Sequence, residues 1–212
     1  MLASVLTLIA LLSAFLTIAS DYGHRRRWVW FAKPFTLVCL MGLALSTART
    51  DRYASTILVG LGLSLLGDVF LMLDKARFYR HGLFAFLLAH LAYIVAFGQP
   101  HDFLVRPSVW LPLALLGLGY YVTLSPRLGR ERLPVAAYVA VISLMGMQGL
   151  EMALAGDSRT TWLAALGALI FMASDATHAW NRFCRPFRAA QGVILSTYFL
   201  AQWLIAYSLL PG

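Results

Sequence analysis

Two aspartates lie inside long apolar segments of the sequence, where a charged side chain is rare. Asp68 follows the run SLLG and precedes VFLML, and Asp175 lies within ALIFMASDATHAW. A carboxylate at the centre of a membrane-spanning helix costs roughly 2.5–3.5 kcal/mol and normally faces a bundle interior or a wet cavity. Two carboxylates in different surroundings can divide acid and base roles, because the more desolvated one keeps its proton. The pair therefore predicts acid–base chemistry inside a membrane.

The composition predicts an all-α, polytopic membrane protein. Of the 212 residues, 60% are hydrophobic and only 12% are charged, whereas a soluble domain is about half apolar and a quarter charged. Eight helices of about 20 residues would leave loops of a few residues each and no room for a separate soluble domain. We expect a single domain over residues 1–212. Its spans are predicted at about 2–19, 30–47, 54–73, 82–98, 108–124, 134–154, 161–180 and 189–209.

The positive charge follows the loops between these spans. Three Lys or Arg lie in or beside each of four alternate loops: Arg25, Arg26, Arg27; Lys75, Arg77, Arg80; Arg127, Arg130, Arg132; and Arg182, Arg185, Arg188. By the positive-inside rule these loops are cytoplasmic and both termini lie outside, as expected of a multi-pass protein of a bacterial inner membrane. The loops also attract anionic lipid headgroups. The net charge of +8 thus needs no nucleic-acid partner.

The first apolar run is predicted to be a retained helix. No positive residue precedes it, and the cluster at 25–27 follows it, which is the reverse of a secretory signal. The two cysteines, Cys39 and Cys184, fall in or beside apolar runs. This placement is typical of reduced packing residues and excludes a disulfide scaffold.

The two aspartates are predicted to lie at one depth. Each is six residues from a polar residue at the cytoplasmic end of its span, Asp74 or Asn181, and is therefore about 9 Å from that end. Matched depth favours a shared site. The alternative is that the acids only bond across helices or to Lys33 and Arg182, which would make packing specific.

Other polar side chains share this layer. His90 and Tyr198 lie within about 13 Å of the same surface, and Lys33 is expected at the surface itself. His90 continues a helical face with Tyr93, and Tyr198 continues one with Gln202. Each of these faces could line a cavity or could serve only interhelical hydrogen bonding.

Two further chemistries are less well supported, and a third acidic residue is predicted to lie outside the site. Asp175 and His178 are i, i+3 neighbours that His90 could join at a zinc ion, but no second close-spaced ligand pair appears. An intramembrane aspartyl protease would resemble Gly-x-Gly-Asp, whereas Leu65 replaces the first glycine before Asp68. Glu151 is predicted near the outer interface, about 27 Å from the cytoplasmic start of its span. We expect no metal and no other cofactor.

The chain also shows a weak internal similarity. LLGDVFLMLDKARFYRHG in the third and fourth spans parallels FMASDATHAWNRFCRPFR in the seventh and eighth, and Pro34 and Pro134 open the second and sixth spans. Two four-helix halves in parallel would place equivalent residues at equal depth. The predicted equal depth of the two aspartates does not depend on this duplication.

Five ordered motifs carry a family resemblance. They are KPFTL, SLLGDVFLML, GLFAFLLAHLAYI, ALIFMASDATHAWNRF and STYFLAQWLIAYS. From about Lys33 to Tyr207 the chain resembles the YhhN family of membrane proteins, which includes the lysoplasmalogenases and, in animals, the transmembrane protein 86 group. The resemblance implies hydrolysis of the vinyl ether of a lysoplasmalogen, a lysophospholipid, to a fatty aldehyde and glycerophosphoethanolamine or glycerophosphocholine.

The resemblance also implies roles for residues. The family motifs map onto Lys33, Asp68, His90, Tyr93, Asp175, Asn181, Tyr198 and Gln202. Asp68 and Asp175 would be the acid–base pair, with His90 and Tyr198 orienting the water or the glycerol oxygen. Lys33 or a loop arginine would hold the phosphate, and Asn181, Tyr93, Gln202 and Asp74 would contact the substrate. His178 lies where the family pattern looks apolar, which argues further against zinc.

Two other function classes stay open. A proton-coupled transporter or lipid flippase could use the same acids as a proton relay, but such a site usually lies at the membrane midplane. A non-catalytic membrane scaffold would tolerate Asp-to-Asn changes at both positions. The sequence leaves the oligomeric state and the headgroup preference open.

Overall fold

The structure is a computed structural model that describes residues 1–73, 76–99 and 106–210, without the side chains of residues 76 and 77. The described residues form α-helices and two short 3₁₀ helices and no strand, which confirms the predicted all-α class. The helices are α1 (Leu2–Tyr22), α2 (Arg26–Leu45), α3 (Arg52–Met72), α4 (Ala76–Phe97), α5 (Pro107–Leu124), η1 (Ser125–Arg127), η2 (Gly129–Glu131), α6 (Arg132–Gly156), α7 (Arg159–Phe183) and α8 (Ala190–Tyr207).

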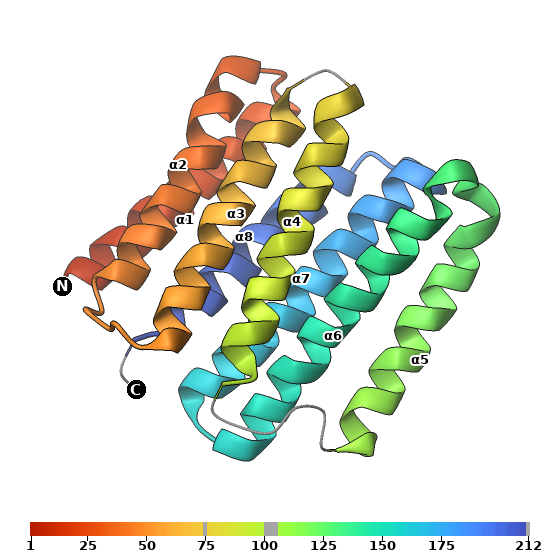
Figure 1. The fold of residues 1–212 in the computed structure, drawn as a ribbon. Helices are drawn as coiled ribbons and strands as arrows, with labels where there is room; N and C mark the ends of the chain where they lie inside the picture. Colours follow the sequence, from red (N-terminus) through yellow and green to blue (C-terminus); the bar gives the residue numbers. More distant parts are fainter. Residues whose placement is uncertain (74–75, 100–105, 211–212) are drawn as a thin grey trace.

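The α-helices run side by side in one bundle (Figure 1). Within the described residues, seven helices, α1 to α7, are long and apolar enough to cross a membrane. The polar residues Gln191, Tyr198 and Gln202 lie on α8, an 18-residue helix that contacts α7, α2, α1 and α3. An eighth crossing by α8 remains a prediction.

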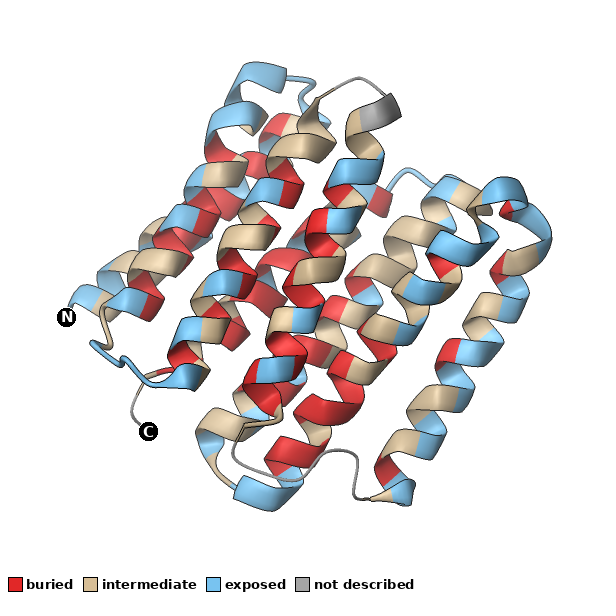
Figure 2. Cartoon of the chain, in the orientation of Figure 1, coloured by how far each residue is buried: buried red, intermediate tan, exposed pale blue. Residues whose placement is uncertain are grey.

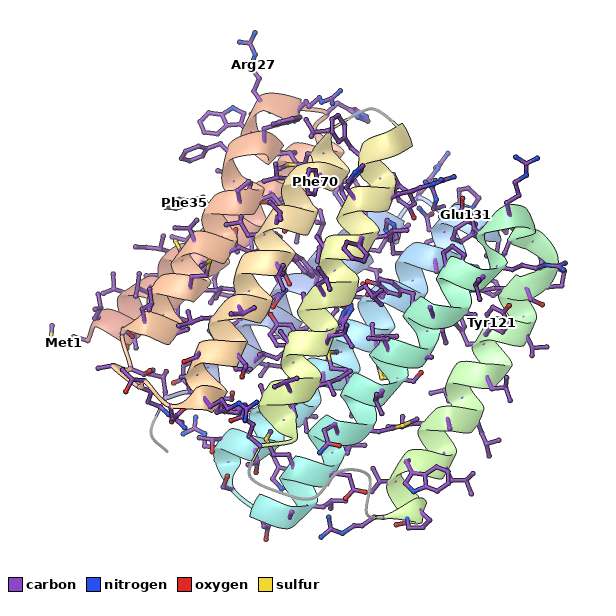
Figure 3. All side chains as sticks on the ribbon, in the orientation of Figure 1. Met1, Arg27, Phe35, Phe70, Tyr121 and Glu131 are labelled. Atoms are coloured by element: carbon purple, nitrogen blue, oxygen red, sulfur yellow. The ribbon has the colours of Figure 1, made fainter. Side chains whose placement is uncertain are left out.

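The two ends of the bundle differ in charge. The connections after α1, α5 and α7 and the end of α3 lie at one end of the bundle, and the start of α1 and the end of α8 lie at the other (Figure 1). Figure 3 shows Arg27 and Glu131 toward the first of these ends and Met1 at the opposite one. We call the first the basic end, because the arginines of the predicted basic loops, such as Arg25, Arg130 and Arg185, lie there.

Large apolar side chains cover the outside of the bundle. Leu8, Phe15, Val38 and Leu116 are more than half exposed, and Figure 2 shows the buried residues concentrated on the inward faces of the helices. Most of α5 is exposed or half-buried. It packs mainly on α6, and its Tyr120 hydroxyl donates a hydrogen bond to the Ala176 carbonyl of α7. An apolar exterior of this extent is suited to lipid rather than to water.

Close packing of α3 on α4 sets the position of Asp68. Gly67 faces the ring of Phe86, and a Cβ on Gly67 would meet that ring at 2.7 Å. Gly60 faces the ring of Tyr93 in the same way. Small residues let helices approach closely in membranes, so these glycines fix Asp68 relative to the aromatic face of α4.

The start of α2 corrects the sequence prediction. The helix begins at Arg26 rather than near residue 30, so Pro34 lies inside the helix and not in its first turn. Arg and Trp are compatible with a helix, and α2 therefore extends beyond the apolar run. Lys33 consequently lies about 10 Å from the helix start, and it is mostly buried rather than at the surface.

The helix contacts follow a repeated pattern. The pairs α3–α4 and α7–α8 are both in close contact, and α4 contacts α6 as α8 contacts α2. Two four-helix halves related by a twofold axis would give this pattern. The duplication itself remains a prediction.

Candidate active site

A cavity of about 1410 Å³ opens into the bundle from the basic end. All eight α-helices contribute residues to it, and most of these come from the half of each helix nearer the basic end. Asp68 and Asp175 both line it, as do Lys33 and Tyr198. The structure therefore brings the predicted acid pair to one cavity from α3 and α7.

Asp68 lies between two partners on other helices. One carboxylate oxygen is 2.8 Å from Nζ of Lys33, and the other accepts a hydrogen bond from the Tyr198 hydroxyl at 2.8 Å. The Asp68 side chain is only 1% exposed and that of Lys33 is 13% exposed. A buried charge is stable when it is paired and hydrogen-bonded, so Lys33 supports an ionised Asp68.

Asp175 has different surroundings. Its Oδ2 accepts a hydrogen bond from the Tyr138 hydroxyl at 2.6 Å and is 3.6 Å from Nε2 of His90. Among the described residues no Lys or Arg forms an ion pair with Asp175, and its side chain is 20% exposed. The two carboxylates thus differ in both charge environment and access to the cavity.

His90 lies behind Asp175 and not in the cavity wall. Its side chain is fully buried, its ring packs edge-on against Phe171 and Tyr138, and neither nitrogen has a hydrogen-bond partner within the described structure. From this position His90 can help to orient Asp175. It does not face the volume where a substrate would lie.

Three other predicted substrate contacts also lie outside the cavity wall. The Tyr93 hydroxyl donates to Oε1 of Gln202 at 2.6 Å, and both side chains are fully buried. Asn181 accepts a hydrogen bond from the backbone N–H of Phe187 at 3.2 Å, which stabilises the connection between α7 and α8. The fourth predicted contact, Asp74, lies outside the described residues.

Sequence reasoning did not single out Tyr138. Its side chain lines the cavity and bonds to Asp175. The available signal was depth: Tyr138 is four residues, about 6 Å, after Pro134, where its span was predicted to begin. That places it in the predicted polar layer, but tyrosines are common in membrane helices and position alone did not distinguish it.

The remaining predicted polar residues are accounted for by the packing. Glu151 is buried and forms an ion pair with Arg106 at 2.9 Å, at the end opposite the cavity. In the part of the chain that the structure describes, no group of three or more His, Cys, Asp or Glu side chains could hold a metal ion. Cys39 and Cys184 are free thiols, as predicted.

The sequence has relatives among known membrane proteins. It matches the YhhN family over residues 28–209. It is 42% identical to human lysoplasmalogenase TMEM86A over 160 residues, which are 73% of this chain and 65% of that protein. It is 35% identical to human lysoplasmalogenase TMEM86B over 85% of this chain and 76% of that protein.

A bacterial relative covers more of the chain. The uncharacterized membrane protein YhhN of Escherichia coli O157:H7 is 29% identical over 93% of this chain and 95% of that protein. No solved structure matches. The family match covers most of the chain and confirms the resemblance carried by the five motifs, and we conclude that the chain belongs to the YhhN family.

Proposed function

We propose that this protein hydrolyses the vinyl ether bond of lysoplasmalogens, as the names of its relatives TMEM86A and TMEM86B indicate for those proteins. The observation that supports this most directly is a cavity open at one end that contains two aspartates in unlike surroundings. A transporter site usually lies at the midplane and is reached from both sides. The described cavity instead lies toward the basic end, which favours an enzyme.

The unlike surroundings suggest a division of roles. Asp68, paired with Lys33, would be the ionised carboxylate. Asp175, which accepts a hydrogen bond from Tyr138 and has no Lys or Arg ion-pair partner among the described residues, would hold the proton. Pairs of carboxylates whose environments differ commonly serve as acid and base.

The reaction follows from this division. Asp175 would protonate the outer alkene carbon, which leaves an oxocarbenium ion that the Asp68 carboxylate stabilises electrostatically. Water then adds to the cationic carbon and loses its proton to a carboxylate. The hemiacetal breaks its bond to the glycerol oxygen, which takes up a proton, and a fatty aldehyde and an alcohol are released. The net change is the addition of one water molecule.

The shape of the cavity suits a lysophospholipid. Its deeper wall is apolar and includes Leu113, Ile142 and Met172, which could contact an alkenyl chain. The vinyl ether of such a lipid lies just beneath the headgroup, and Asp68 and Asp175 lie about 6 Å and about 12 Å from the ends of α3 and α7 at the basic end. The substrate's reactive bond and the acid pair would therefore meet at the same depth.

The test is aldehyde release from lysoplasmenylethanolamine by the detergent-purified full chain. Asp68→Asn and Asp175→Asn each remove one carboxylate with little change in shape, and we expect both to lose activity at least 100-fold while gel filtration reports a folded protein. Asp157→Asn is the matched control. Asp157 lies at the C-cap of α6 with φ 38°, a conformation that Asn tolerates, at the end opposite the cavity.

Two outcomes would contradict the proposal. One is a folded wild type that releases no aldehyde from either the ethanolamine or the choline substrate. The other is full activity in both aspartate variants. In the first case a proton-coupled transporter or flippase becomes the leading hypothesis, and lipid translocation in proteoliposomes would test it.

A further inference from the structure

One face of α7 presents three functional side chains to the cavity. Asp175, His178 and Arg182 are spaced i, i+3 and i+7 and all line the cavity. Along the helix axis His178 lies about 4.5 Å and Arg182 about 10.5 Å from Asp175, toward the basic end. These residues form a line from the acid pair to the cavity mouth.

Arg182 is held in place by an aromatic ring. Its guanidinium carbon lies 3.6 Å from the ring centroid of Tyr79 on α4, which also lines the cavity. Stacking on an aromatic face leaves the guanidinium N–H groups at its edge free to donate. Within the described structure no carboxylate forms an ion pair with Arg182, whereas Lys33 is paired with Asp68.

His178 carries an unpartnered polar atom just behind the same wall. Its Nε2 is buried and has no hydrogen-bond partner among the described residues, although the residue lines the cavity. Its ring stacks on Tyr79 at 6.4 Å between centroids. Buried polar atoms normally have partners, so an unpartnered nitrogen beside a cavity indicates a polar group of a ligand.

We propose that Arg182 and His178, ordered by Tyr79, bind the phosphate of a lysophospholipid headgroup. This inference rests on the proposed function for the position of the substrate. About five bonds of roughly 1.5 Å separate the ether oxygen of a lysoplasmalogen from its phosphorus, an extended reach of about 6 Å. With the vinyl ether at Asp175, the phosphate therefore lies between the levels of His178 and Arg182. This assigns phosphate binding to α7 rather than to Lys33.

The test measures binding and not turnover, so it does not depend on the aldehyde assay. The ligand is an alkyl lysophosphatidylethanolamine, whose saturated ether is not a vinyl ether, titrated against intrinsic tryptophan fluorescence in detergent. We expect Arg182→Gln and His178→Phe to weaken binding at least tenfold, and Arg182→Lys to weaken it less. Arg27→Gln removes a charge at the same end from a residue that points away from the bundle (Figure 3) and leaves affinity unchanged.

Two further ligands distinguish a lipid phosphate from free inorganic phosphate. Alkylglycerol, which has no phosphate, binds wild type and Arg182→Gln equally. Inorganic phosphate at millimolar concentration does not displace the lipid. Three results would overturn the proposal: unchanged lysophospholipid affinity in folded Arg182→Gln, an equal loss of alkylglycerol binding, or displacement of the lipid by inorganic phosphate alone. Lysophospholipid binding that depends on Arg182 in a protein without aldehyde release would reject only the proposed hydrolysis.

Discussion

The hydroxyl groups of two tyrosines define the orientation of the two aspartates. Tyr198 donates to Asp68 and Tyr138 donates to Asp175, and each bond joins a different pair of helices. A hydrogen bond to an ionised carboxylate, as proposed for Asp68, contributes about 1.5–3 kcal/mol, and one to an uncharged carboxyl, as proposed for Asp175, about 0.5–1.5 kcal/mol. At the scale of single residues, Lys33 and Tyr198 bind both oxygens of Asp68, whereas Tyr138 binds only Oδ2 of Asp175 and leaves its Oδ1 available to a substrate.

Removing the Tyr138 hydroxyl tests this orienting role. In Tyr138→Phe the ring remains, but Asp175 loses its hydrogen bond. We expect kcat for aldehyde release to fall about three- to tenfold, since a hydrogen bond to an uncharged carboxyl is worth about 0.5–1.5 kcal/mol, while KM changes less than threefold. Tyr121→Phe on α5, which does not line the cavity, is the control and keeps wild-type kcat. Equal kcat values in the two variants would mean that Tyr138 has no part in orienting Asp175.

The helices position these side chains through their contacts with one another. The apolar runs of the sequence predicted where the helices lie, because membrane spans have a fixed length and a simple composition. They did not predict that Lys33 reaches Asp68 or that Tyr93 bonds to Gln202. Those pairs depend on the rotation and register of neighbouring helices, which are set by contacts between residues far apart in the chain.

Gly60 makes one of these contacts between helices. A Cβ at this position would overlap the Tyr93 ring, so Gly60→Ala would push α3 and α4 apart and disturb the Tyr93–Gln202 bond. We expect the apparent unfolding temperature in detergent to fall by several degrees. Gly119→Ala on α5 is the matched change, because a Cβ there meets no atom within 4 Å and Ala favours a helix over Gly. An unfolding temperature for Gly60→Ala at or above that of wild type would show that this approach does not limit stability.

Asp51 stabilises the start of α3, at the end opposite the cavity. Its carboxylate accepts a hydrogen bond from the Ala54 N–H at 2.8 Å, and this bond and the neighbouring Arg49 hold the Asp51 pKa below its usual 3.8. We expect Asp51→Ala to lower the unfolding temperature by a few degrees at pH 7, since a lost cap costs about 0.5–2 kcal/mol.

The pH dependence of this effect follows from the sign of the shift. A lowered folded-state pKa stabilises the protein above pH 3.8, and that contribution disappears as the pH falls through the folded-state value. The difference in unfolding temperature between wild type and Asp51→Ala therefore becomes smaller below pH 3.8. Thermal unfolding at pH 7 and at pH 3 would reveal this change. Asn at position 51 also caps the helix but does not titrate. The difference in unfolding temperature between Asp51→Asn and Asp51→Ala therefore stays the same at both pH values.

For the molecule as a whole, the sequence predicted the class, the approximate helix positions and the layer that contains the acids. The positions of Lys33 and Pro34 within their helix were predicted wrongly, because the hydropathy boundary at residue 30 is not the start of α2. His90 and Tyr93 show another limit. Helical periodicity placed them on one face of α4, but it could not show that this face packs against the core rather than the cavity.

Membrane orientation is a prediction for the whole molecule. In a bacterial host, alkaline phosphatase fused after α8 would be active, because that enzyme requires a non-cytoplasmic environment. The same reporter inserted after Arg185, between α7 and α8, would be inactive. A reporter that is active after Arg185 and inactive after α8 would show the opposite orientation. Equal reporter activity at the two positions would show that α8 does not cross the membrane.

The polarity gradient of the cavity, with arginines at its mouth and leucines at its base, has a consequence for the fate of the products. Under the proposed reaction the aldehyde would remain dissolved in the hydrocarbon phase, and the glycerophosphodiester would diffuse into water. Separation into two phases keeps the products from recombining, so hydrolysis proceeds in one direction without an external energy source. Turnover would then follow the mole fraction of substrate among the membrane lipids and not its concentration in bulk solution.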